Sequence, residues 1–490
     1  MQPPRAGSPS DRAAFWPKSA RGRLVLVLAT ALLVLIPVEV VLAVEAPRPS
    51  IAPAVWFAFA SRIDHIVFVV MENHPYDNLY GTYCTATGPN CPIAANGIPR
   101  GSCLPLNTTA PNGPCVRPFA FTAQNASVTT PLPHDWNSST RAFDGGLMDG
   151  FYAAEQSGRD PFGHYNGSTA PTYWDLAEEY ALSDNFYSSV LSYSLPNHWH
   201  IVAGQAPPEI VTHGTGLRGA GPGFLQVDRQ YLAEANGTSS VEDLLLNSST
   251  SWGYYDFPLP TYDHALVANQ SLSGAAYAYW NPLAAKAESY TAGLAPHFHA
   301  SAQFFGDAHN GTLPNIAWVI PPSQYSDHPP ERVDAAQGWL ASVVDSVEAS
   351  PEWNSSVVFV TWDDYGGFYD HVAPPVANGA QLGFRVPLLA IGPYVREGYV
   401  THAPTYFESI LHLMEWRFRL GCLVPLDCNA PLPLDLLNFS APRRSPIFFP
   451  TDVNLTSYPM PLQPRGAFVP APAFEPPSRF VAFARRPDVD

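Results

Sequence analysis

The chain has 490 residues, of which 46% are hydrophobic, with Trp 12, Tyr 23 and Phe 27, and this composition excludes a globally disordered protein. Its length fits one large α/β domain or two smaller domains. The formal net charge is −17, and lysine occurs only at Lys18 and Lys286, which argues against bulk binding to nucleic acid or to anionic membranes. Charged residues make up 14%, well below the roughly 25% of an average soluble domain. This indicates a surface that does not depend on ionised carboxylates, as a secreted protein exposed to acid would need.

Residues 1–50 have the pattern of a targeting segment. Basic residues up to Arg23 precede an apolar stretch over residues 24–44. Small residues at Ala43 and Ala46 allow cleavage before Pro47, but roughly 20 apolar residues also suffice for an uncleaved membrane anchor. Both alternatives place the chain from residue 50 onward outside the cytoplasm, so we expect an extracellular or cell-surface protein, secreted or anchored through residues 24–44.

Two further features are typical of exported proteins. Asparagines in N-x-S/T sequons predict N-glycans on surface loops. The 6 cysteines lie in three close pairs without zinc-type spacing, which predicts three short-loop disulfides, Cys84–Cys91, Cys103–Cys115 and Cys422–Cys428, one of several pairings that the number allows. The sequons are at Asn107, Asn125, Asn137, Asn166, Asn236, Asn247, Asn269, Asn310, Asn354, Asn438 and Asn454.

Strands and helices alternate along the middle of the chain. Apolar runs predict strands at residues 64–71, 315–320, 357–362 and 386–391, and helical spacing predicts helices over 172–180, 334–347 and 406–420. This alternation predicts an α/β/α sandwich around a mainly parallel sheet. We expect one domain over residues 51–430, with residues 84–133 as a disulfide-stapled insertion and a Pro-rich tail over 431–490 that wraps the domain or is disordered.

Two predicted strands end in acidic segments, where α/β proteins gather functional groups. Residues 71–77 (MENHPYD) offer a carboxylate and an amide oxygen, which suit a metal, although on this motif alone a helix cap or turn is the favoured explanation. Residues 358–371 (VFVTWDDYGGFYDH) place two adjacent carboxylates at a strand end, where they repel each other unless a cation is present. A solvated acidic turn does not account for the Gly-Gly pair and His371 together, so we favour a functional site here.

A third segment, residues 191–198 (LSYSLPNH), offers a hydroxyl nucleophile. Serines are common in turns, and a serine needs a neighbouring base or metal to become nucleophilic. The acidic segments supply a place for such a metal. Ser192 and Ser194 are rivals that point to the same side of an extended segment.

Taken together, these segments resemble the phosphoesterase family of bacterial phospholipases C and acid phosphatases, which has an alkaline-phosphatase-like fold. The chain departs from the family pattern in two places, because His74-Pro75 and His198 replace an Arg-Ser pair and an arginine. The matching segments are residues 70–77 (VMENHPYD), 134–136 (HDW), 148–151 (MDGF), 194–198 (SLPNH), 327–330 (DHPP), 361–372 (TWDDYGGFYDHV), 385–387 (RVP) and 392–395 (GPYV).

The resemblance implies a metal-dependent hydrolase of phosphoric esters. A divalent metal, whose identity the ligand types do not choose, would be held by Glu72, Asn73, Asp363 and Asp364. Spacing to the Pro-Asn pair selects Ser194 as the nucleophile that forms a phosphoserine. The candidate proton donors are His134 and His328, with His371 third, as a ligand or an acid.

Three functions compete. The first is an acid phosphatase that hydrolyses small phosphate monoesters, and the second is a phospholipase C that hydrolyses a phospholipid diester. The phospholipase branch usually carries additional C-terminal β-domains, and only roughly 70 residues follow Cys422, which favours the phosphatase. The third is a glycosylated envelope protein without activity, which does not require the acidic pairs and Ser194 to be kept together.

Overall fold

The computed structural model describes residues 53–88, 91–126, 129–155, 158–213, 217–219, 225–227, 229–256, 280–286 and 293–453, all of which belong to one compact unit. The predicted signal or anchor at residues 24–44 lies outside this part of the chain. Within it, no helix is long and apolar enough to cross a membrane.

The core is a nine-stranded sheet in the order β10-β9-β11-β1-β12-β15-β6-β16, with β17 also paired to β6. All neighbouring strands are parallel except at β15, which runs antiparallel to both β12 and β6. The mainly parallel sheet that the sequence predicted is thus confirmed. Its strands are β1 (His65–Met71), β6 (Ala181–Tyr187), β9 (Trp252–Asp256), β10 (Phe298–Ala300), β11 (Ile316–Val319), β12 (Ser356–Trp362), β15 (Arg385–Ile391), β16 (Tyr399–Thr401) and β17 (Thr405–Tyr406).

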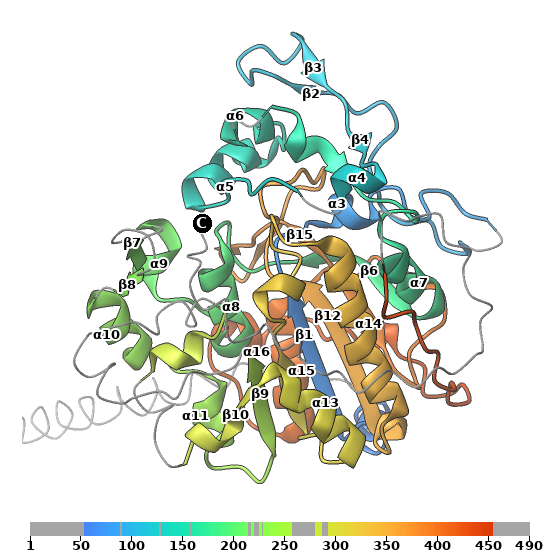
Figure 1. Cartoon of the computed structure of the whole chain (residues 1–490). Coiled ribbons are helices and arrows are strands. Elements are labelled where there is room, and N and C mark those ends of the chain that lie inside the picture. The colour runs from blue at the N-terminus through green and yellow to red at the C-terminus, as the bar shows by residue number, and fades with distance from the viewer. Residues whose placement is uncertain are drawn as a thin grey trace, which may run out of the picture. The chain divides into compact units, whose positions relative to one another are not determined.

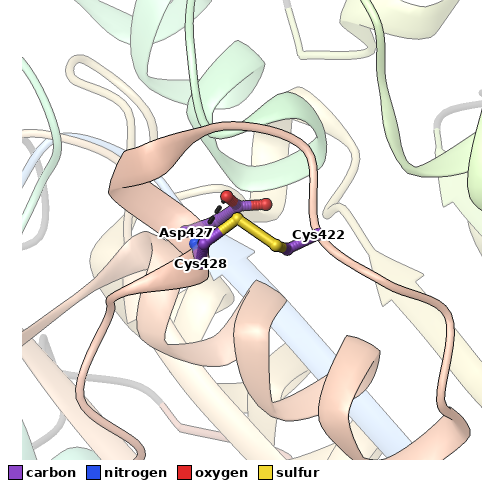
Figure 2. Close-up of side chains that lie close together, drawn as sticks. All are labelled: Cys422, Asp427 and Cys428. Carbon is purple, nitrogen blue, oxygen red and sulfur yellow. Dashed lines mark hydrogen bonds between the residues drawn. A yellow bond between two sulfur atoms is a disulfide. The ribbon is translucent and has the colours of Figure 1, made fainter. Parts of the chain in front are cut away.

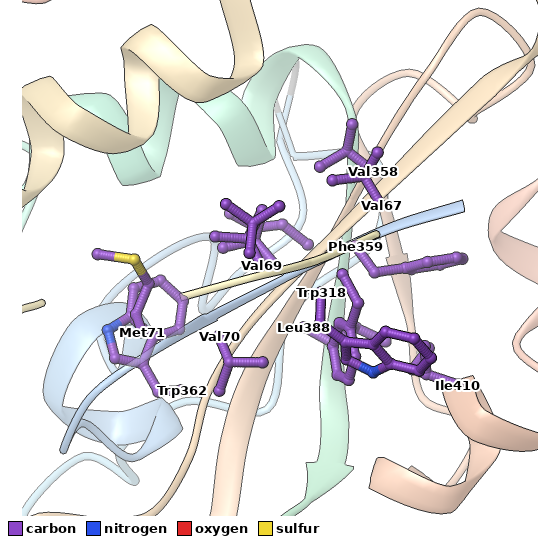
Figure 3. Close-up of a cluster of buried hydrophobic side chains, with 14 of the residues drawn as sticks. Val67, Val69, Val70, Met71, Trp318, Val358, Phe359, Trp362, Leu388 and Ile410 are labelled. Carbon is purple, nitrogen blue, oxygen red and sulfur yellow. The ribbon is translucent and has the colours of Figure 1, made fainter. Parts of the chain in front are cut away.

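The central strands β1 and β12 are buried on both faces because almost every residue in them is apolar. Their register pairs Val67 with Val358 and Met71 with Trp362. Strand alternation therefore places these four side chains on one face of the sheet, and Phe359 on the other (Figure 3).

Helices cover both faces, which confirms the predicted α/β/α sandwich. On the Trp362 face, Tyr173 of α7 (Pro171–Glu179) packs against the Trp362 ring, and α7 lies beside α14 (Val333–Ala349), which lies beside α13 (Ser301–Asn310) (Figure 1). On the other face, Ile410 of α15 (Phe407–Phe418) lies near Phe359 (Figure 3), and α15 packs on α8 (Ser194–Ala203) and α2 (Pro53–Ala60).

Shorter elements decorate this sandwich. The helices are α3 (Tyr76–Tyr80), α4 (Ala123–Ala126), α5 (Trp136–Phe143), α6 (Phe151–Glu155), α9 (Pro208–His213), α10 (Arg229–Gly237), α11 (Val241–Leu245) and α16 (Pro425–Cys428). The strands are β2 (Leu104–Pro105), β3 (Cys115–Val116), β4 (Phe119–Ala120), β5 (Gly163–His164), β7 (Leu217–Gly219), β8 (Leu225–Val227), β13 (Val376–Ala377) and β14 (Ala380–Gln381).

Three disulfides staple the loops, and all three nearest-neighbour pairings are confirmed. Cys84–Cys91 and Cys103–Cys115 lie in the predicted insertion, where β2 and β3 form a small hairpin away from the main sheet (Figure 1). Cys422–Cys428 closes the loop that leads into α16. These bonds restrict loops that would otherwise be held by few packing contacts.

The described part of the Pro-rich tail, residues 431–453, passes the segment after β15 and then contacts α14. The backbone N–H of Ile447 donates to Glu348 at 3.0 Å, and that of Phe449 donates to Asp345 at 3.0 Å. The Phe449 side chain is buried. This stretch therefore wraps the domain, and residues 454–490 lie outside the described part.

Candidate functional site

Two acidic segments meet at the carboxyl ends of β1 and β12. Because Met71 and Trp362 pair in register at the last positions of these parallel strands, Glu72 and Asp363 follow side by side. The backbone N–H groups of Asn73 and Asp364 both donate to Asp363 Oδ1, at 2.9 and 2.8 Å. Glu72, Asn73, Asp363 and Asp364, the four predicted metal ligands, are all buried.

The Gly-Gly pair allows these segments to approach. Gly366 has φ 56°, and a Cβ built on it would lie 2.2 Å from the backbone oxygen of Asn73. Its N–H also donates to Asp364 Oδ1 at 2.7 Å. A larger residue at position 366 would therefore push the two loops apart. The close approach of the loops explains why this position is a glycine.

Ser194 is the first residue of α8 and faces the acidic pair. Its Oγ donates to Glu72 Oε2 at 2.9 Å, whereas Ser192 Oγ donates to the backbone oxygen of Val211 at 3.1 Å. Asn197 holds this turn, because its Oδ1 accepts from Ser189 N at 3.1 Å and its Nδ2 donates to Ser192 O at 3.1 Å. Of the two rival serines, the structure brings Ser194 to the carboxylates.

His198 lies one turn further along α8 and contacts the same carboxylates. Its Nε2 is 2.9 Å from Glu72 Oε1 and 3.8 Å from Asp363 Oδ2, and the side chain has no exposed surface. The sequence showed His198 only as a departure from the family pattern and assigned it no role. Its spacing of four residues from Ser194, which places both on one helix face, was the signal that could have found it.

Either a proton or a bound cation relieves the charge repulsion in this group. Burial, followed by the nearby Asp363 and Asp364 carboxylates, raises the pKa of Glu72 well above its usual value. Burial lowers the pKa of His198 to about 4, so the imidazole is neutral near pH 7. Among the described residues, neither Glu72 nor Asp363 has a lysine or arginine partner.

A divalent metal fits this donor set. Asp363 Oδ2 and Asn73 Oδ1 are buried and have no hydrogen-bond partner in the described part of the chain. Glu72, His198 and Asp363 offer donor atoms that lie within 4.8 Å of one another. A bound divalent ion would supply the missing partner of these buried oxygen atoms. It would also balance the charge of the neighbouring carboxylates. The donor types do not choose a particular ion.

His134 and His328 border this group. His134 Nε2 lies 3.9 Å from Asp364 Oδ2, and the centroids of the His134 and His328 rings lie 6.3 Å apart. The Trp280 ring centroid also lies 6.3 Å from that of His328. The two histidines therefore stand where a group bound over the carboxylates would meet them.

His371 belongs to a different cluster, which the sequence did not separate from the first. Its Nδ1 lies 2.6 Å from Asp77 Oδ2. The buried Arg385 donates to Asp77 Oδ1 at 2.9 Å and to both oxygens of Asp370 at 3.1 Å. The structure thus shows no contact of His371 with the carboxylates at the strand ends, and its catalytic role stays a prediction.

A third acidic group, Asp427 with Cys422 and Cys428, does not offer metal ligands. The two sulfurs are joined in a disulfide (Figure 2). The Asp427 carboxylate accepts from the backbone N–H groups of Leu423, at 2.8 Å, and Val424, at 2.8 Å. The group is a loop closure.

Comparison with known proteins shows the family of the chain. The sequence matches the Phosphoesterase family over residues 63–421. It is 25% identical to "Non-hemolytic phospholipase C" of Burkholderia pseudomallei over 73% of this chain, but spans only 55% of that relative. It is 26% identical to "Phospholipase C A" of Mycobacterium tuberculosis, over 74% of each chain.

Solved structures are more distant. An alkaline phosphatase superfamily protein from Vibrio parahaemolyticus matches with a TM-score of 0.30 and 14% identity, over 54% of this chain and 64% of that one. The fold assignment therefore rests on the strand topology, while the family match and the phospholipase C relatives support a hydrolase of phosphoric ester bonds. By its motifs and by this match over most of its length, the chain belongs to the Phosphoesterase family.

Proposed function

We propose that this protein is a metal-dependent phosphoesterase that hydrolyses small phosphate monoesters through a phosphoserine at Ser194, in the manner of an acid phosphatase. The observation that carries the proposal is the 2.9 Å hydrogen bond from Ser194 Oγ to Glu72 Oε2 within a buried carboxylate group that lacks a lysine or arginine partner at Glu72 and Asp363 among the described residues. A structural serine does not need such surroundings.

Ser194 is well placed for attack. It is the first residue of the ten-residue helix α8, so the positive end of the helix dipole stabilises negative charge on its oxygen and on a phosphoryl group nearby. Its proton leaves along the hydrogen bond to Glu72 Oε2 as the Oγ–P bond forms and the bond from phosphorus to the leaving oxygen breaks. Water then attacks the phosphoserine, releasing phosphate and the serine hydroxyl.

The metal would be held by Glu72, Asn73, Asp363 and Asp364. When bound, a divalent ion neutralises charge on the phosphoryl oxygens and lowers the pKa of a coordinated hydroxyl. The chain itself fixes the donors, because Asp363 Oδ1 is bound by two backbone N–H groups and leaves Oδ2 facing the site.

The leaving oxygen needs a proton, and His134 and His328 are the donors within the site. His134 Nδ1 contacts the backbone oxygen of Leu132 at 2.6 Å, and His328 Nδ1 contacts that of Pro329 at 2.7 Å. Each ring is thereby held through Nδ1, and we propose Nε2 as the atom that transfers the proton.

Phospholipase C activity is the second candidate, because the relatives reported above carry that name. It differs from the first only in the substrate, since the same attack by Ser194 on a phospholipid diester releases a diacylglycerol. The low share of charged residues supports activity in acid, which is the part of the first proposal that it bears on.

We also propose that the protein acts outside the cytoplasm, as a secreted or surface-anchored glycoprotein. The three disulfides support this, since such bonds persist in oxidising compartments. Protease accessibility on intact cells, together with the glycosidase sensitivity of the purified protein, tests the location and the glycans.

The function is tested on the purified protein with p-nitrophenyl phosphate and with a phosphatidylcholine vesicle, from about pH 4 to pH 9, with and without a chelator. We expect chelator-sensitive release of p-nitrophenol that is greatest in acid. Chelator-sensitive release of diacylglycerol alone would establish the phospholipase. Absence of both activities after metal reconstitution would refute the enzyme.

A further inference from the structure

We propose that His198 is a nitrogen ligand of the metal, so that this site selects zinc-like ions over magnesium, calcium or manganese. The inference rests on the proposed metal site, and it adds a ligand that the motif comparison did not supply. It begins from an exchange of residue type, since the motif pattern has an arginine where this chain has His198. An arginine cannot bind a metal, whereas a neutral imidazole can.

The position of the ring supports a ligand. His198 Nε2 lies 2.9 Å from Glu72 Oε1 and 3.8 Å from Asp363 Oδ2, and all three side chains have no exposed surface. Donor atoms about 2.0–2.2 Å from a shared tetrahedral ion stand roughly 3.3–3.6 Å apart, and this spacing lies between the two observed separations. These three residues therefore surround one point with a nitrogen and two carboxylate oxygens.

The other ring nitrogen is compatible with this role. His198 Nδ1 is buried and has no hydrogen-bond partner among the described residues, whereas Nε2 lies at hydrogen-bond distance from Glu72 Oε1. Without an ion the proton is therefore on Nε2, and a bound ion would take its place, leaving the ring proton on Nδ1 and the Nε2 lone pair toward the carboxylates. The orphaned Asp363 Oδ2 faces the same point, and its missing partner is a second sign of a ligand there.

The exchange also alters charge. An arginine at position 198 would add a permanent positive charge between Glu72 and Asp363 and would compete with the metal for their oxygens. A neutral imidazole adds no charge, so the ion alone balances the charge of the carboxylates. Its nitrogen is a ligand atom of intermediate softness. Imidazole suits zinc, copper, iron and nickel, whereas all-oxygen sites suit magnesium, calcium and manganese.

The alternative is that His198 only positions Glu72 by donating an Nε2–H hydrogen bond. The variant His198→Gln separates the two roles, because its amide N–H can still donate to Glu72 but offers no nitrogen lone pair. His198→Arg restores the residue of the motif pattern. His309→Gln removes an exposed histidine from the end of α13 and is the matched control.

Zinc and manganese affinities are measured on the metal-stripped full-length protein by competition with a chromophoric chelator. For His198→Gln we expect a loss in zinc affinity on the order of tenfold to 100-fold, a much smaller change for manganese, and no change for His309→Gln. His198→Arg should weaken both ions. Equal losses for zinc and manganese in His198→Gln, or no loss, would overturn the ligand role.

A second measurement can refute the inference on the wild-type protein alone. Pulsed electron paramagnetic resonance of the wild-type protein loaded with one equivalent of Cu²⁺ should show imidazole nitrogen coupling, and this coupling should be absent from folded His198→Gln. Absence of the coupling in the wild type would refute the inference even if the protein binds metal and hydrolyses phosphate esters. Failure to bind any divalent ion would instead refute the proposed function itself.

Discussion

The loops after β1 and β12 build two acidic clusters, and only one of them is neutralised by the chain. In the inner cluster, Glu72 and Asp363 have His198 as their basic partner among the described residues. In the outer cluster, Asp77 and Asp370 share the buried guanidinium of Arg385.

The difference favours the inner cluster as the reactive one. Arg385 also donates to the backbone oxygens of Asn96, at 2.8 Å, and Asp184, at 2.9 Å, so its guanidinium is fully used in holding loops together. Such a closed network stabilises structure, whereas carboxylates left without a cation prepare a site for one. The same two loops thus provide a structural anchor and, a few residues earlier, a candidate active centre.

The largest effect is expected at the nucleophile of the inner cluster. Ser194→Ala should lower kcat on the order of 10⁴-fold or more while metal binding is retained, because the attacking oxygen is lost and the carboxylates remain. Acid-quenched reactions with labelled substrate should trap phosphate on Ser194 of the wild type. Ser192→Ala, whose hydroxyl contacts Val211, is the matched control. Label on Ser192, or full turnover in Ser194→Ala, would contradict the assignment.

The second-largest effect is expected when one aspartate in each cluster is replaced by asparagine, which has nearly the same shape. The two replacements should differ in their effect on metal binding. Asp363→Asn should weaken metal affinity on the order of 100-fold and abolish activity at ordinary metal concentrations, because a charged ligand is lost. Asp370→Asn removes one carboxylate beside Arg385 and should retain the bound metal. Metal content by elemental analysis and affinity by chelator competition distinguish the two. Loss of metal from Asp370→Asn but not from Asp363→Asn would show that the outer cluster, and not the inner one, holds the ion.

Breaking the outer cluster should instead cost stability. Arg385→Met leaves Asp77 and Asp370 buried without their partner, and we expect the free energy of unfolding to fall by about 3–5 kcal/mol. Denaturant titration measures this change, with Arg396→Met, at an exposed position, as the control. If Arg385→Met is as stable as the wild type, the outer cluster does not anchor the loops.

The sequence predicted four of the nine sheet strands, β1, β11, β12 and β15, because these four are nearly continuous apolar runs. The boundaries of β1, β11, β12 and β15 fall within about two residues of the predicted ranges, as is usual for such signals. Strand β6 was missed because Ser183, Asp184 and Asn185 interrupt its apolar pattern. The antiparallel direction of β15 depends on its long-range partners and has no local signal.

Within the site, the sequence located residues that follow strand ends, because parallel strands deliver them to one edge. It placed His371 with these residues because they share one loop. The direction in which a loop turns after Gly366-Gly367 cannot be read from residue types, and that turn carries His371 to Asp77. The pairing of Asp77 and Asp370 with Arg385 joins three distant segments and was likewise invisible.

A smaller effect is expected from pH. Burial raises the pKa of Glu348 to about 8 and of Asp345 to about 7, and raises that of Glu72. For such acids the folded state binds protons more tightly than the unfolded state, so stability is fully present below their ordinary pKa of about 4 and is lost as pH rises through the folded value.

The Tm of the chelated protein should therefore fall from about pH 5 to pH 8. The stabilisation by added metal should grow over the same range, because protons compete with the ion for Glu72. Glu348→Gln, remote from the site on α14, should remove part of the fall without altering the metal effect. A metal effect that is constant with pH would contradict the role of Glu72.

The most direct test is an anomalous diffraction map of crystals of the metal-loaded protein. The account predicts a peak at the carboxyl ends of β1 and β12, with Glu72 and Asp363 oxygens about 2.0–2.6 Å from the ion. It predicts no peak between Asp77, Asp370 and Arg385. An ion bound in that outer cluster, with none beside Ser194, would contradict the central claim.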